Sequence, residues 1–308
     1  MPELLDHRFL FVVGKGGAGK TTVSAALAVA AARKGKRVLL AMCNSKERLS
    51  YLLEVPPIGP HNVSVRANLD AVNMVPEQAL EEYALMVLRS RTLYRAIFDN
   101  RIVHAVLRGT PGIEAWSMLG KAFFHTKEEL ENGKRRYDLV VLDAPATGHG
   151  LEMLRVPRVI VDVAPPGLLR NEAEGALELF RDPQRAGVVL VTLPEDMPTN
   201  ETIELHRALL TRELSMPPKA LVVNQVLPRL FAPSERSSII GLPSVVPEGS
   251  PLHGLSLAGR GRAMREEIQE VSLARLAKEL PGLPRTTLPM LFVPEFRREA
   301  IESLSQAF

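Results

Sequence analysis

The stretch GKGGAGKT, residues 14–21, holds the side chains best suited to chemistry in this sequence. It follows the apolar run FLFVV and opens an alanine-rich segment, as a phosphate-binding loop between a strand and a helix does. Glycines let backbone N–H groups approach phosphate oxygens, and a helix N-terminus adds partial positive charge. Lys20 would contact the terminal phosphates and the Thr21 hydroxyl would ligate Mg²⁺. We therefore expect ATP and Mg²⁺ as cofactors.

The whole loop is expected to contact the nucleotide, and a carboxylate elsewhere is expected to complete the metal site. The loop residues predicted to bind the cofactor are Gly14, Gly16, Gly17, Ala18, Gly19, Lys20, Thr21 and Thr22. A second apolar run, YDLVVLD, ends in Asp143, and a carboxylate in that position holds Mg²⁺ through water in P-loop proteins. Thr21 and Asp143 are thus the predicted metal residues, and Lys20 and Asp143 are predicted to be catalytic.

Buried strands are expected to position these residues. Short apolar runs rich in β-branched residues occupy 9–13, 37–42, 137–143, 187–193, 219–225 and 288–293, with a weaker candidate at 69–75. Helical patterns lie between them, the strongest at 20–35, where Gly35 is a plausible stop. This alternation predicts an α/β fold with a doubly wound, mostly parallel sheet.

Two stretches, about 76–128 and 229–280, interrupt the alternation. We interpret them as helical insertions on one side of the sheet, within a single domain spanning 1–308. The first insertion carries apolar residues at helical spacing. They are Leu80, Tyr83, Met86, Val87, Leu93, Tyr94, Ile97, Phe98, Ile102 and Val106. Packing of helices on each other explains most of them, and a groove for a hydrophobic client is the alternative.

Composition limits the function classes. The net charge is +3, with 38 basic and 35 acidic residues interspersed along the chain, so we expect no nucleic-acid partner. A single cysteine excludes a disulfide within the chain and fits a reducing compartment. The N-terminus lacks a secretory pattern, and no run of eighteen apolar residues exists, so we expect a cytoplasmic protein without a transmembrane segment.

Lys15 adds a second lysine at the start of the loop, giving KGGAGKT. This form resembles the loop of the deviant Walker A ATPases. In that group the early lysine reaches across a dimer to the partner's nucleotide, so the resemblance implies a catalytic role for Lys15 in a face-to-face dimer. The dimer could be a homodimer or a heterodimer with a paralogue. A solvated loop lysine is the alternative.

The segment DAPATGH, residues 143–149, is similar to the DTAPTGH switch of the arsenite-pump and tail-anchored-protein-targeting ATPases. Thr147, Gly148 and His149 match in register. Ala144 stands where that family has threonine, and the proline comes one residue early. We identify the chain as a divergent, bacterial-type relative of that family, which implies a P-loop ATPase whose nucleotide state controls a hydrophobic surface for a client.

Four further segments extend the resemblance along nearly the whole chain. PGIEA at 111–115 and VTLPEDMPTNETIEL at 191–205 are similar to the family's helical insertion and to a segment near its dimer interface. VVNQVLP at 222–228 resembles its adenine-contacting strand end, which implies that Asn224 reads the base. PMLFVPEF resembles the loop that closes over adenine. The residues implied there are Pro294, Glu295 and Phe296.

The segment AMCNSKERLS, residues 41–50, departs from the family's first switch, STDPAHSLSD. Cys43 stands in register with the first aspartate, and Ser50 or Tyr51 replaces the last, which is thought to position the attacking water. Glu47 could substitute as a catalytic residue if the loop folds differently. Cys43 is either a small apolar residue at a strand end or a reactive thiol.

These departures leave two function hypotheses. The first is an active ATPase that cycles a dimer to hold or move a hydrophobic or membrane-linked client. The second is a regulatory nucleotide-binding subunit with weak or no hydrolysis, paired with a complete paralogue. A partition-type ATPase lacks support, because no basic cluster or terminal amphipathic helix is present. Metalloid extrusion is disfavoured because the arsenite pump uses several cysteines and this chain has one.

Overall fold

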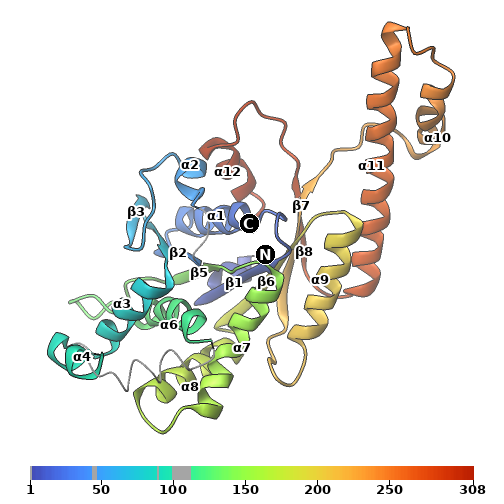
Figure 1. Ribbon diagram of the computed structural model, residues 1–308. Helices are drawn as coiled ribbons and strands as arrows, with labels where there is room; N and C mark the ends of the chain where they lie inside the picture. The colour runs from blue at the N-terminus through green and yellow to red at the C-terminus, as the bar shows by residue number, and fades with distance from the viewer. Residues whose placement is uncertain (1, 44–46, 89, 99–111) are drawn as a thin grey trace.

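A twisted sheet lies at the centre of the computed structural model, which describes residues 2–43, 47–88, 90–98 and 112–308 (Figure 1). In the described chain the sheet has eight strands in the order β3-β4-β2-β5-β1-β6-β7-β8. Every neighbouring pair is parallel except β3 with β4. The strands are β1 (Phe9–Gly14), β2 (Val38–Cys43), β3 (Val63–Arg66), β4 (Leu69–Met74), β5 (Leu139–Asp143), β6 (Ala186–Thr192), β7 (Pro218–Val226) and β8 (Arg285–Pro289). The predicted α/β fold with a mostly parallel sheet is confirmed.

Helices cover both faces of the sheet. On one face lie α1 (Lys20–Arg33), α2 (Leu49–Leu53) and α12 (Arg298–Ser305) (Figure 1). The opposite face carries α3 (Pro76–Leu88), α6 (Ile113–Lys127), α7 (Thr147–Val163), α8 (Leu168–Arg181) and α9 (Asp196–Leu209). The remaining elements are η1 (Pro2–Asp6), α4 (Arg91–Phe98), α10 (Pro233–Gly241), η2 (Leu242–Ser244) and α11 (Pro251–Glu279).

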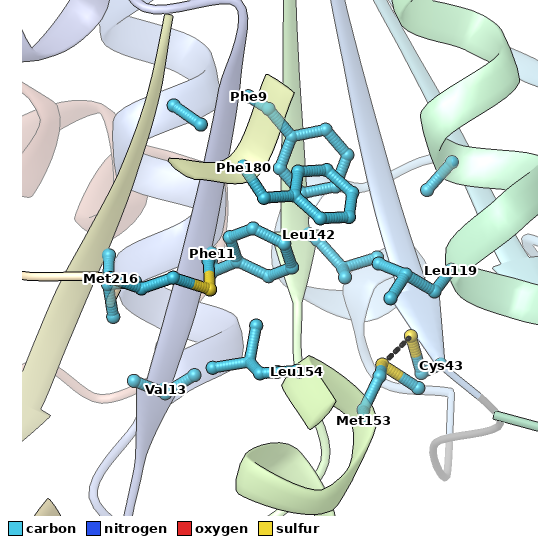
Figure 2. Close-up of a cluster of buried hydrophobic side chains, with 14 of the residues drawn as sticks. Phe9, Phe11, Val13, Cys43, Leu119, Leu142, Met153, Leu154, Phe180 and Met216 are labelled. Carbon is cyan, nitrogen blue, oxygen red and sulfur yellow. Dashed lines mark hydrogen bonds between the residues drawn. The ribbon is translucent and has the colours of Figure 1, made fainter. Parts of the chain in front are cut away.

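The central strands are buried on both sides, which explains why they read as continuous apolar runs. On the α7–α9 face, Phe9 and Phe11 of β1 pack against Phe180 of α8 with ring centroids 5.0 and 4.8 Å from it (Figure 2). The other face takes the alanine-rich α1, whose small side chains let the helix lie close to the sheet. This packing fixes the strand ends, from which the phosphate loop and Asp143 emerge.

Three details differ from the expected strands. The run at 288–293 was expected to be a strand, but β8 lies earlier, at Arg285–Pro289. β-branched Thr286 and Thr287 pair with β7, whereas Phe292 and Val293 lie exposed in a loop. The weaker candidate at 69–75 is β4, the neighbour of β2. β3 was not predicted, because it is a four-residue antiparallel edge strand with a half-exposed pattern.

The described secondary-structure elements of the two interrupting stretches are all helical: α3, α4 and α6 in the first, and α10, η2 and α11 in the second. α3 and α6 pack on each other and on the core of the α7–α9 face, and the C-terminal end of α11 reaches the same core through Leu276 and Leu280. The N-terminal half of α11 extends past the sheet beside α10 (Figure 1). Among the described residues, no helix is long and apolar enough to cross a membrane. Ile102, Val106 and the first residue of PGIEA lie outside the described residues, as do the side chains of Leu93, Ile97 and Phe98.

Candidate functional site: a phosphate-binding loop

The loop between β1 and α1 has the backbone shape of a phosphate cradle. Gly17 and Gly19 both adopt φ of 85°, a left-handed conformation that favours glycine. A Cβ on Gly19 would also lie 2.3 Å from Nδ2 of Asn224, so a side chain there has no room. Gly16 and Gly17 are exposed and Ala18 is buried, which leaves the loop open to a ligand on its outer side. The loop therefore depends on glycine for its shape and for its packing.

Lys20 begins α1 and bends back over the loop. Its Nζ lies 3.1 Å from the carbonyl oxygen of Gly14 and 3.3 Å from that of Lys15. Burial lowers the pKa of Lys20, and the nearby Asp143 carboxylate partly opposes that effect. Within the part of the chain that the structure describes, Lys20 forms no ion pair with a carboxylate. A half-buried ammonium group that contacts only carbonyls fits an anionic ligand such as a phosphate.

Asp143 ends β5 directly beside the start of α1. Thr21 Oγ1 donates to its Oδ2 over 2.6 Å, and Ser24 Oγ donates to its Oδ1 over 3.3 Å. The carboxyl group is buried, and this burial raises the pKa of Asp143 to about 6, although the hydrogen bonds and Lys20 oppose the shift. A carboxylate and a hydroxyl held together are the hard oxygen ligands that Mg²⁺ prefers. The residues present thus fit a magnesium ion at Thr21 and Asp143.

Asn224, at the C-terminal end of β7, lies behind the loop. It is buried, and its Nδ2 donates to the carbonyl oxygen of Ala18 over 3.0 Å. The hydrogen bond ties β7 to the turn that precedes α1, so Asn224 supports the loop in this structure. The next residue, Gln225, is exposed with φ of 56°. The strand end therefore has a strained backbone beside the site.

The segment expected to close over adenine runs from β8 to α12. Pro294 and Glu295 are exposed and Phe296 is half-buried against the core of the α1 face. Glu295 forms an ion pair with Arg297 at 2.7 Å. The guanidinium of Arg297 also lies 5.0 Å from the ring centroid of Tyr51, which links this segment to α2.

Lys15 points toward α9 rather than toward the loop. Its Nζ lies 2.7 Å from Oε1 of Glu201 and 3.9 Å from Sδ of Met197. Both charged side chains are about one quarter to one third exposed, with values of 26% and 32%. Lys15 is thus held by its own chain, next to the exposed Met197 at the start of α9.

The segment after β2 differs in character from the phosphate loop. Cys43 is buried, with its Sγ 4.0 Å from Sδ of Met153, and burial together with Asp143 raises the pKa of the thiol (Figure 2). It behaves as a core residue and not as a thiolate. Glu47 accepts hydrogen bonds from the backbone N–H and the hydroxyl of Ser50 over 2.7 and 2.5 Å. Its carboxylate therefore caps the first turn of α2.

The DAPATGH segment brings a second loop to the phosphate loop. A Cβ added to Gly16 would lie 3.6 Å from Cβ of Ala146, so the two loops lie close together. His149 is exposed in the first turn of α7, 3.4 Å from Glu152. Thr22 lies half-buried in the first turn of α1. The loop residues, Thr21, Asp143 and Asn224 thus come together. Glu47 instead contacts Ser50 in the first turn of α2, and His149 contacts Glu152 within α7.

Sequence reasoning missed two residues of this site. Ser24 is one turn beyond Thr21 on α1, and that spacing could have identified it as a second partner of Asp143. Glu201 lies in the segment VTLPEDMPTNETIEL, but no local pattern indicates that it pairs with Lys15, which is far away in sequence.

The loop, the buried carboxylate and the parallel sheet define a P-loop ATPase. The chain matches the anion-transporting ATPase family (ArsA_ATPase) over residues 7–164 and 169–235. It therefore belongs to that family, and its expected resemblance to arsenite-pump and tail-anchored-protein-targeting ATPases is confirmed.

Relatives support this membership at moderate identity. The chain is 31% identical to the ATPase BagA of Mycobacterium tuberculosis over 239 residues, covering 76% of this chain and 69% of the relative. It is 26% identical to the arsenical pump-driving ATPase of Escherichia coli over 297 residues, covering 91% of this chain and 46% of that protein. It is 26% identical to the ATPase GET3 of Kluyveromyces lactis over 255 residues, with 72% of each chain covered.

Proposed function

We propose that this chain binds MgATP at residues 14–22, hydrolyses it, and works as a dimer that couples nucleotide state to a hydrophobic or membrane-linked client. The observation that carries the proposal is the buried Asp143 carboxylate hydrogen-bonded to Thr21 beside Lys20, which forms no ion pair within the described chain. In this arrangement Lys20 would bind the terminal phosphates, and Thr21 and Asp143 would hold Mg²⁺. The bound ion would offset phosphate charge.

The dimer and the client are supported by two surfaces. Lys15 lies beside exposed Met197, at a position from which its side chain could turn to a partner's nucleotide. A cavity of about 690 Å³ is bordered by α3, α6 and α8. Apolar residues of α3 line it together with charged residues of α6, α8 and the loop after α6. The described residues lining it are Leu85, Met86, Val87, Phe124, Lys127, Glu128, Glu129, Leu168 and Glu172. Tyr83, by contrast, is buried against Trp116, so part of the apolar sequence there serves helix packing.

The direct test is phosphate release from the purified chain under saturating MgATP, compared with ATP binding measured separately. We expect Mg²⁺-dependent release that is lost in Lys20→Ala. Absence of ATP binding at saturating Mg²⁺ would refute the proposal, because nucleotide binding is common to both function hypotheses.

A weakly hydrolysing regulatory subunit is the second candidate, and one observation favours it. Glu47 is the one acidic residue in the segment AMCNSKERLS, and its carboxylate is used by Ser50. Without another group to position water, ATP would bind tightly with negligible turnover. Restoration of phosphate release by an added paralogue would distinguish this candidate from the first.

A further inference from the structure

α11 carries an apolar stripe that the rest of the described chain covers only in part. Leu257, Met264, Ile268 and Val271 are 49, 42, 47 and 68% exposed. Their spacing of seven, four and three residues places them on one face of the helix. Buried residues of α11, such as Ala263 and Glu266, lie on other faces, toward α10 and the preceding loop. Large apolar side chains exposed along one face of a helix indicate an interaction surface.

The two ends of the stripe are placed symmetrically about Met264. Leu257 and Val271 lie seven residues before and after it. Arg260 and Glu267 lie on one flank of the stripe, and the midpoint between them falls next to Met264. Neither side chain forms a salt bridge with any residue that the structure describes. A two-fold axis near Met264 would bring Arg260 of one copy opposite Glu267 of the other, twice. This self-complementary arrangement is that of an isologous contact.

Gly261 supports the same axis. It lies on the stripe inside a long helix, where glycine lowers helix stability relative to alanine. A Cβ at this position would meet nothing within 4 Å, so nothing in the described chain requires a glycine. In an antiparallel pair centred near Met264, Gly261 faces the region of Ile268 in the second copy, and the missing side chain makes room for it.

We infer that α11 pairs in antiparallel fashion with α11 of a second copy of this chain. The inference rests on the proposed dimer and names its second subunit as an identical chain. The surface is continuous with the nucleotide-proximal region, because Ile268 and Arg265 line a cavity of about 520 Å³ together with Met197, the neighbour of Lys15.

Single-cysteine cross-linking tests the pairing, because the native Cys43 is buried and its thiol is unreactive. Met264→Cys places one thiol near the axis, and we expect a disulfide-linked dimer under mild oxidation. Leu257→Cys is the matched control on the same stripe. In an antiparallel pair its two copies lie about 21 Å apart along the helices, at 1.5 Å per residue, so it should not cross-link. Equal cross-linking of both variants, or none with Met264→Cys, would overturn the inference.

Reversing the charges of Arg260 and Glu267 tests whether the partner of α11 is a second copy of the chain. We expect Arg260→Glu and Glu267→Arg each to raise the dimer dissociation constant at least threefold in analytical ultracentrifugation, and the double variant to restore it. Val245→Glu changes a more exposed residue, in the loop between η2 and α11, and should have no effect. Two results together would show that the region of η2 and α11 binds lipid and that the pairing is wrong. In the first, Val245→Glu alone removes binding to neutral-lipid vesicles; in the second, the charge variants leave self-association unchanged. ATP binding by the same variants, measured separately, shows whether the phosphate site still works.

Discussion

The phosphate loop and the segment after β2 lie at neighbouring strand ends, yet they are built in opposite ways. Around the loop, polar groups are buried and oriented toward one another: Thr21 and Ser24 both donate to Asp143. After β2, Cys43 joins the apolar core and Glu47 accepts hydrogen bonds from Ser50 in the first turn of α2. Under the proposed function, nucleotide binding and water positioning therefore fall to separate elements. One can therefore persist while the other changes.

The largest expected effect is on the phosphate loop. Lys20→Ala should weaken ATP binding about 100-fold, because charge-assisted hydrogen bonds to the phosphates contribute about 3 kcal/mol. Binding of a fluorescent ATP analogue is the measurement. Lys15→Ala is the matched control and should leave ATP binding by the isolated chain within about threefold. Equal losses in both variants would mean that the two lysines share one phosphate site.

Asp143→Asn tests the proposed magnesium site beside the phosphate loop. The pKa of Asp143 is raised to about 6 from an ordinary value of 3.8. The folded protein then binds a proton that the unfolded chain lacks between about pH 4 and 6, so the free energy of unfolding of the ligand-free protein rises as pH falls through that range. The asparagine variant removes this pH dependence and gains up to about 3 kcal/mol at pH 7.

Asp143→Asn should also lose the increase in ATP affinity that Mg²⁺ provides. In the native chain this increase should become smaller below about pH 6, because the Asp143 carboxyl group is then protonated. Denaturant unfolding with and without MgATP measures both effects. Ser24→Ala serves as the control, since it removes only the longer hydrogen bond. An unchanged response to Mg²⁺ in Asp143→Asn would place the metal elsewhere.

Glu47→Gln tests the segment after β2. Because the carboxylate already accepts both hydrogen bonds from Ser50, we expect a loss of about 1 kcal/mol in stability, as for a helix cap, and a change in phosphate release of less than twofold. Thermal unfolding and steady-state turnover report the two quantities. A tenfold fall in turnover with unchanged ATP binding would instead assign Glu47 to water positioning.

The smallest effect concerns the pair between Lys15 and Glu201. An exposed pair contributes about 0.2–1 kcal/mol, so Glu201→Gln should free Lys15 and tighten ATP-dependent self-association two- to fivefold. Light scattering across a concentration series measures it. Glu204→Gln, exposed on the same helix, is the control. Weaker association in Glu201→Gln would show that the pair supports the interface.

Local sequence predicted the sheet and the loop well because both depend on short-range rules. Apolar runs identified the central strands, and Gly17 and Gly19 occupy positions that demand positive φ. The position of β8 was wrong because pairing with β7, rather than hydrophobicity, decided it. The contacts of Lys15 with Glu201 and of Asn224 with Ala18 join residues about 200 positions apart, and no spacing rule reveals such pairs.

The length of α11 has a mechanical consequence. Its 29 residues span about 43 Å, and Gln269 ties its C-terminal half to the backbone N–H and carbonyl of Leu227, just past β7. Pro251 begins the helix about 27 Å from Gln269, so a rotation of about 10° at that anchor would move this end by about 5 Å. Leu227, which holds Gln269, lies three residues after Asn224. A small rotation of the β7 end behind the phosphate loop would therefore produce a larger displacement at the N-terminal end of α11.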